Sequence, residues 1–247
     1  MQYVLPSINC DIGESFGLYR MADDAAIMPF ITVANVACGF HAGDPVVMAR
    51  TVALATQHCV KIGAHPSLPD LQGFGRREMR MAPQEITAAI VYQVGALQGF
   101  LKQAGAPLNH IKPHGALYGM AARMPEIAEA VVEAAAVFGV PVFGLADTAQ
   151  EAACARRNIG FVGEFYADLD YDDDGGLIIT REHRAVDPGT ATDRVAKALF
   201  DGRTKSINGR DLRVSATSVC VHSDTPGALA IAKAIHDLLA SHLGGAA

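Results

Sequence analysis

The feature that most constrains this chain is a regular alternation of short apolar runs with longer segments of helical period. Such alternation is typical of strand-helix-strand units and of a mainly parallel sheet, because each crossover helix returns the chain to the same end of the sheet. We expect about seven such units, which together span nearly the whole chain. The predicted strands are residues 3–10, 30–38, 60–64, 110–112, 140–144, 160–165 and 218–222.

Length and composition favour a single α/β barrel domain over residues 1–247. Hydrophobic residues make up 50% of the chain and charged residues 19%, so a substantial core can form. A formal net charge of −6 without a Lys/Arg-rich run argues against a nucleic-acid partner, since such binding depends on neutralising phosphates. With no signal-peptide pattern or membrane-spanning run, we expect a cytoplasmic protein and no membrane partner. The five cysteines form no CxxC pair, which predicts reduced thiols.

Local capping signals mark several helix starts. Asp44 and Thr225 each precede a proline, whose missing N–H is tolerated in the first helical turn. Thr148 and Glu151 have the spacing of a capping box. A long helix is expected to begin near Pro83 and to cover the sheet with one apolar face, formed by Ile86, Ile90, Val94, Leu97 and Leu101.

Two connections, residues 65–82 and 167–188, are longer than usual for α/β units and are candidates for binding loops or lids. The second contains an acidic run that resembles a calcium loop. Arg181 stands where such a loop needs its bidentate glutamate, so we interpret this run as a solvated acidic lid.

Polar residues recur where the predicted strands end. In a parallel barrel these ends converge on one face, where residues distant in sequence can form a common site. Several unrelated strand ends repeat the pattern, which favours a site over separate structural roles. The residues are Asn9, Asp11, Glu14, Asn35, His41, His65, Lys112, His114, Glu164, Asp168, His222 and Asp224.

Some of these residues suggest particular chemistry. Asp11 and Glu14 can hold a metal or divide general acid and base roles, because environment can push the pKa values of neighbouring carboxylates apart. His41 is a candidate for proton transfer or ligation, whereas the nearby Cys38 is better explained as packing. We assign no site role to five other histidines, which match the ordinary rate of structural or exposed histidine: His58, His110, His183, His236 and His242.

Basic residues suggest how an anion could be held. Arg76 and Arg77 follow a glycine-rich turn that can cradle a phosphate or carboxylate, although no P-loop pattern is present. Lys112 and His114 flank a proline, where an ammonium and an imidazole can stabilise an oxyanion and move a proton. Tyr118 follows closely and can help to position a substrate.

Six motifs together resemble the LamB/YcsF lactam-utilisation family, whose bacterial members are identified as one of the subunits of ATP-dependent 5-oxoprolinase. The resemblance covers essentially the whole chain and implies a seven-stranded barrel of the glycoside hydrolase/deacetylase type. It also implies hydrolysis of the lactam of 5-oxo-L-proline to L-glutamate at the expense of ATP, with Mg²⁺ and two companion subunits. The motifs are NCDIGES, NVACGFHAGDP, GAHPSLPDLQGFGRR, KPHGALY, GEFYAD and VHSDTPGA.

The family motifs do not resolve the individual role of each residue. Leu169 stands where the family pattern leads us to expect arginine, so a related cyclic amide stays open as the substrate. We predict catalytic roles for Asp11, His41, His65, Lys112 and His114. We predict substrate binding by Asn9, Glu14, Asn35, Arg76, Arg77, Tyr118, Glu164, Asp168, His222 and Asp224.

Two other functions remain as alternatives. A metal-dependent deacetylase or amidohydrolase could use Asp11, His41 and His65 as ligands. A non-catalytic subunit could instead present substrate to its partners. The sequence leaves open whether the protein binds a metal, which of the subunits binds ATP, and the oligomeric state.

Overall fold

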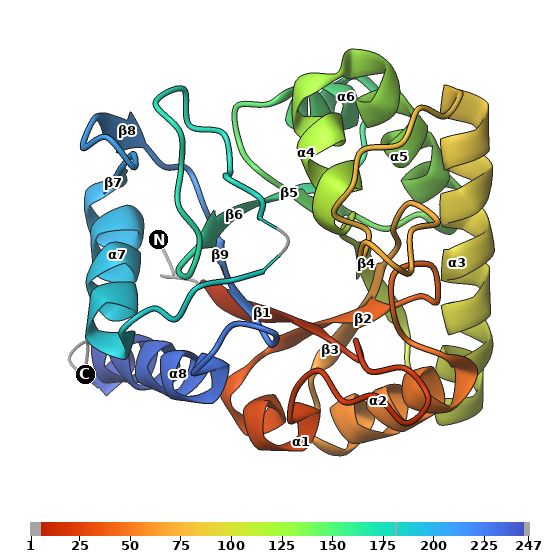
Figure 1. Cartoon of the computed structure of the whole chain (residues 1–247), viewed down its shortest axis with the longest axis horizontal. Helices are drawn as coiled ribbons and strands as arrows, with labels where there is room; N and C mark the ends of the chain where they lie inside the picture. Colours follow the sequence, from red (N-terminus) through yellow and green to blue (C-terminus); the bar gives the residue numbers. More distant parts are fainter. Residues whose placement is uncertain (1–5, 181, 245–247) are drawn as a thin grey trace.

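The computed structural model describes residues 6–180 and 182–244. Its centre is a closed barrel of seven parallel strands in the order β1-β2-β3-β4-β5-β6-β9, with helices packed around the outside (Figure 1). The predicted seven-stranded α/β barrel is confirmed. No helix within the described part of the chain combines the length and apolar character needed to cross a membrane.

Each of the seven predicted strands corresponds to a barrel strand, although their limits differ by a few residues. Residues 3–5 of the first predicted strand lie outside the described residues, and residues 30–32 of the second precede the observed strand. The barrel strands are β1 (Ser7–Ile12), β2 (Val33–Ala37), β3 (Lys61–His65), β4 (Leu108–Ile111), β5 (Val142–Gly144), β6 (Phe161–Tyr166) and β9 (Ser218–His222).

An antiparallel hairpin, β7 (Arg203–Lys205) and β8 (Asp211–Arg213), was not predicted, because its short polar strands form no apolar run. The helices connect successive barrel strands, except that α8 follows the last one. They are α1 (Asp24–Ile27), the 3₁₀ helix η1 (Met28–Phe30), α2 (Pro45–Gln57), α3 (Pro83–Ala104), α4 (Gly115–Arg123), α5 (Pro125–Phe138), α6 (Ala149–Arg156), α7 (Pro188–Asp201) and α8 (Ala228–Gly244).

The predicted helix starts had mixed outcomes. Asp44 caps α2 by accepting the backbone N–H groups of Val46 at 2.8 Å and Val47 at 3.3 Å, as predicted. The start assigned at Thr225 was two residues early, since a turn precedes α8. The capping box at Thr148 was wrong, because its hydroxyl donates to the Leu145 carbonyl at 2.7 Å instead of capping α6. The predicted apolar face of α3 is fully buried.

Alternate residues of each strand point into the barrel. Several of these inward side chains are polar, and they bond to one another. Asn9 donates to the Ser218 hydroxyl at 2.7 Å and accepts from the Asn35 amide at 2.8 Å. The His110 Nε2 lies 2.7 Å from Asn35 Oδ1, so this histidine belongs to the barrel network, which the sequence did not predict. These bonds satisfy buried polar groups on four strands.

Gly63 of β3 provides the space for the His110 ring. A Cβ at this position would fall well inside contact distance of the imidazole. The ring has little freedom to move, because it bonds Asn35 and stacks on Phe143 with centroids 4.0 Å apart.

Gly63→Ala should therefore destabilise the fold by about 1–3 kcal/mol through overpacking. The measurement is chemical denaturation followed by circular dichroism. Gly95→Ala is the matched control, because Gly95 is exposed on α3 with nothing within 4 Å of an added Cβ. That control should be neutral or stabilise the protein by up to about 1 kcal/mol. Equal stability of the two variants would contradict the packing argument.

Candidate active site

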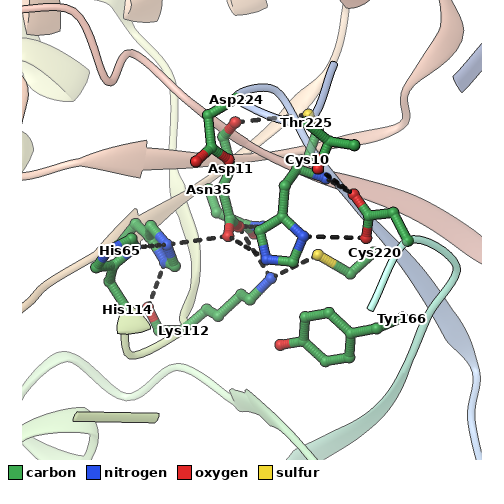
Figure 2. Close-up of polar contacts among 12 residues, drawn as sticks. Cys10, Asp11, Asn35, His65, Lys112, His114, Tyr166, Cys220, Asp224 and Thr225 are labelled. Atoms are coloured by element: carbon green, nitrogen blue, oxygen red, sulfur yellow. Dashed lines mark hydrogen bonds and ion pairs between the residues drawn. The ribbon is translucent and has the colours of Figure 1, made fainter. Parts of the chain in front are cut away.

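The buried side chain of Lys112 occupies the middle of the site, directly after β4 (Figure 2). Its Nζ lies 2.9 Å from Asp11 Oδ1 and 3.2 Å from Glu164 Oε1. Asn9 Oδ1 at 3.1 Å and Cys220 Sγ at 2.9 Å complete its surroundings. The ammonium therefore connects β4 with β1, β6 and β9 through the barrel interior.

The charges around this ammonium keep it protonated. Burial alone would lower the pKa of Lys112, but Asp11, Cys220 and Glu164 outweigh burial and raise this pKa well above its usual value. Burial would raise the pKa of Asp11, but His65 and Lys112 reverse the effect and hold it well below its usual value. Burial raises the pKa of Glu164 despite Lys112. The stable arrangement is thus an ammonium paired with the Asp11 carboxylate.

Three histidines and two carboxylates meet beside Lys112. His65 Nε2 lies 3.2 Å from Asp11 Oδ2 and 2.9 Å from His114 Nδ1. Glu14 Oε1 lies 3.0 Å from His41 Nε2 and 3.4 Å from His114 Nδ1. Since these residues lie at or just after the ends of β1, β2, β3 and β4, the predicted convergence of strand ends is observed.

Burial disfavours charge on most of this group. It lowers the pKa of His114, and the neighbouring His41 and His65 lower it further. Burial and His65 likewise lower the pKa of His41. Burial, with Asp224 and Asp11 nearby, raises the pKa of Glu14 well above its usual value. Burial therefore favours the neutral imidazoles of His41 and His114.

His222 has the opposite preference. Its Nδ1–H donates to Asp168 Oδ1 at 3.0 Å, while its backbone N–H and the Thr225 hydroxyl each donate to Asp168 Oδ2 at 2.9 Å. Burial alone would lower the pKa of His222, but Asp168 outweighs it and raises the value. Burial would raise the pKa of Asp168, but His222 reverses that effect. The pair favours an imidazolium beside a carboxylate.

A second buried ion pair borders the site. The Arg76 guanidinium lies 2.8 Å from Asp224 Oδ2, and His183 Nδ1 lies 3.2 Å from Asp224 Oδ1. Burial would raise the pKa of Asp224, but its bond to His183 and the charge of Arg76 lower it. The sequence missed His183 because it lies in a long connection, where no strand end marks it.

The two predicted anion-binding arginines are separated. Arg77 pairs with Asp70, and its side chain is 53% exposed, so the structure does not bring it into the cluster with Arg76. Cys220 and Tyr166 were also missed, although the alternation of their strands places both inward. The other predicted residues contact Lys112, line the cavity beside it, or contact residues that do: Asn9, Asp11, Glu14, Asn35, His41, His65, His114, Tyr118, Glu164, Asp168, His222 and Asp224.

The cavity at this site is small. It measures about 20 Å³, which accommodates about one water molecule and no lactam ring. Leu169, Leu177 and Ile179 from the connection between β6 and α7 form part of its wall. That connection therefore lies beside the cavity, and its lid role stays a prediction. The cavity is also lined by Asp11, His65, Lys112, His114 and His222.

The family comparison agrees with the sequence motifs, since residues 7–244 match the model of the LamB/YcsF family. The chain belongs to the LamB/YcsF family. It is 47% identical to the lactam utilization protein of Emericella nidulans over 92% of this chain and 90% of that protein. It is 46% identical to a 5-oxoprolinase subunit of Bacillus licheniformis, with 92% of each chain covered. The crystal structure of a lactam utilization protein from Thermus thermophilus superposes with a TM-score of 0.89 at 37% identity, covering 97% of both chains.

The pairing of His222 with Asp168 can be tested by Asp168→Asn. Removing the carboxylate should lower the pKa of His222, which NMR titration of the imidazole measures. The variant should be less stable by about 1–3 kcal/mol because a buried charge-assisted bond is lost. A raised His222 pKa contributes stability below its unfolded value, near 6.5, and this contribution disappears as pH rises through the folded value.

The stability difference between the two proteins should therefore shrink at alkaline pH, as chemical denaturation at several pH values will measure. Asp170→Asn is the control, because that carboxylate is 48% exposed and pairs with Arg194. It should change stability by no more than about 0.5 kcal/mol. An unchanged His222 titration in Asp168→Asn would refute the assignment.

Proposed function

We propose that this chain is the lactam-opening subunit of an ATP-dependent 5-oxoprolinase, which hydrolyses 5-oxo-L-proline to L-glutamate together with two companion subunits. The names of the relatives support this substrate and the subunit organisation. The observation that carries the proposal is a buried ammonium and an imidazole that favours protonation, Lys112 and His222, on one cavity.

The chemistry of a lactam explains why both groups are useful. An unstrained lactam keeps its amide resonance, so its carbonyl carbon is a poor electrophile until the oxygen is activated. Lys112 stabilises the negative charge on this oxygen and on the phosphoryl group that it carries as water adds to the carbon. His222 then donates its proton to the ring nitrogen as the carbon–nitrogen bond breaks, and Asp168 stabilises the imidazolium before that transfer. The added water supplies the hydroxyl of the new carboxylate.

Water must also lose a proton as it attacks. We assign this role to the Glu14 carboxylate, because burial raises its pKa and so makes it a stronger base. The site thereby keeps a basic group and an acidic group in different surroundings, as paired acid-base catalysis requires.

ATP enters this proposal as a co-substrate, with Mg²⁺, that phosphorylates the lactam oxygen before water adds to the carbon. Ring opening then leaves an acyl phosphate, and a second water molecule cleaves it to L-glutamate and inorganic phosphate. The two arginines predicted to hold phosphate are already paired, Arg76 with Asp224 and Arg77 with Asp70. The sequence also has no P-loop pattern. We therefore assign nucleotide binding to the companion subunits and lactam opening to this chain.

The geometry is less favourable to the deacetylase alternative based on Asp11, His41 and His65. Asp11 Oδ1 is engaged by Lys112, whose positive charge opposes a cation on the same carboxylate. A chain that only presents substrate would need neither the buried ammonium nor the paired His222. Activity measurements on reconstituted protein distinguish these possibilities.

The purified chain alone should show little or no turnover of 5-oxo-L-proline. Adding both companion subunits should yield glutamate and ADP in a ratio of about one to one, because phosphorylation and opening are coupled. The two products are measured in the same reaction by chromatography and a coupled assay. Other small lactams should be tested in parallel, since Leu169 forms part of the cavity wall. Equally efficient hydrolysis by the chain alone without ATP would contradict the proposal.

Lys112→Met should lower coupled turnover by about 10²–10³-fold, the usual effect of removing one donor to a developing oxyanion. Circular dichroism and assembly with the companions must be measured alongside, because the variant leaves two buried carboxylates without their partner. Lys102→Met on the exposed end of α3 is the control and should retain full activity. Normal turnover in a folded Lys112→Met protein would exclude the assigned role.

A further inference from the structure

Two histidines in the site, His65 and His114, each use one ring nitrogen to hydrogen-bond a backbone carbonyl. His65 Nδ1 lies 2.8 Å from the carbonyl oxygen of Lys112, and His114 Nε2 lies 2.7 Å from that of Phe74. A carbonyl oxygen only accepts hydrogen bonds, so each of these nitrogens carries a hydrogen. In the neutral rings, His65 Nε2 and His114 Nδ1 consequently carry lone pairs. These two atoms face one another at 2.9 Å.

A carboxylate faces the same point. Glu14 Oε1 lies 3.4 Å from His114 Nδ1, and Glu14 is only 2% exposed. Its other oxygen, Oε2, is buried and has no hydrogen-bond partner within residues 6–180 and 182–244. Two imidazole nitrogens thus converge with the buried carboxyl group of Glu14, while His41 Nε2 lies 3.0 Å from Glu14 Oε1 and Asp11 Oδ2 lies 3.2 Å from His65 Nε2. Such an arrangement is unfavourable unless a proton or a cation occupies the space.

We infer that Glu14, His65 and His114 form a binding site for one divalent transition-metal ion of the zinc class. Two imidazoles and a carboxylate are a ligand set that such ions prefer. Ligands about 2.0–2.1 Å from a tetrahedral ion lie about 3.3 Å apart, close to the spacings around His114 Nδ1. The outer hydrogen bonds to carbonyls are the support that metal-binding histidines commonly have. Metal binding itself does not depend on the proposed lactam chemistry; when the ion is bound, activation of water by the ion takes the place of the base role assigned above to Glu14.

His41 lies close enough to be considered as a fourth ligand, but its orientation is wrong. Its ring stacks on His114 with centroids 3.7 Å apart and planes only 5° from parallel. The in-plane lone pairs of two stacked rings cannot point to one ion. His41 Nε2 instead lies 3.0 Å from Glu14 Oε1, where its N–H can orient the carboxylate. We assign His41 a positioning role.

A second group of potential ligands, Asp11, Cys220 and His222, is a weaker candidate. Lys112 Nζ lies 2.9 Å from both Asp11 Oδ1 and Cys220 Sγ, so an ammonium already neutralises this position. Burial also raises the pKa of the Cys220 thiol well above its usual value. The group around His114 is the better candidate. There, ring nitrogens of His65 and His114 face each other, and each ring is held by a hydrogen bond to a backbone carbonyl.

The location suggests what the ion would contribute. His65 and His114 line the same cavity as Lys112 and His222, so an open coordination position would face the substrate. A metal ion there would lower the pKa of a bound water molecule and so help to generate the attacking hydroxide. Three protein ligands with one open position is the usual composition of a catalytic zinc site.

The test uses the untagged full-length chain, because a histidine tag would itself bind metal. After treatment with a chelator and its removal, Zn²⁺ binding is measured by calorimetry and Co²⁺ binding by visible absorption. We expect about one equivalent of each ion and the intense cobalt absorption of a tetrahedral site. Neither companion subunits nor substrate are present, so the result is separate from the lactam proposal.

His114→Ala and the isosteric Glu14→Gln should each weaken Zn²⁺ binding by at least about 100-fold, because each removes a ligand. His41→Ala should weaken it less, by about 10-fold, as expected for a positioning residue. His58→Ala, at an exposed position after α2, is the control and should bind as the parent does. Circular dichroism verifies folding of every variant. Failure of the folded parent to bind either ion, or unchanged binding in Glu14→Gln, would overturn the inference.

Discussion

The buried ammonium of Lys112 is the interaction on which the site depends. A charge removed from water is stable only where opposite charges and hydrogen bonds replace its hydration. Asp11, Glu164 and Asn9 provide these partners from β1 and β6, while Lys112 itself follows β4. The ammonium therefore holds distant strands in one arrangement, and the neighbouring side chains of the site are positioned as a consequence.

A polar barrel interior requires that the apolar core lie elsewhere. Strand alternation directs Ile8, Cys10 and Ile12 of β1 to the apolar layer, while Asn9 and Asp11 belong to the interior network. The long helix α3 adds its buried apolar face to that layer. Stability and chemistry are thus divided between the two faces of the same strands, which leaves the interior available for charged groups.

Histidines within this site differ in their preference for the protonated form. His222 favours protonation because Asp168 accepts from its ring and its backbone, whereas His114 disfavours protonation because it is buried among other imidazoles and near Arg76. Chemical identity alone would give both rings similar pKa values. Their separation across one cavity allows acid and base roles at the same pH.

The sequence by itself determined the barrel and most of the site, because apolar periodicity and strand-end position are local properties. Asp11, His65, Lys112 and His222 were all identified in this way. Only the tertiary structure decided that Arg77 turns to Asp70 and that His183 reaches Asp224. It also decided which ring nitrogens of His65 and His114 face each other. These outcomes depend on contacts between segments far apart in sequence, whose distances and orientations no local pattern encodes.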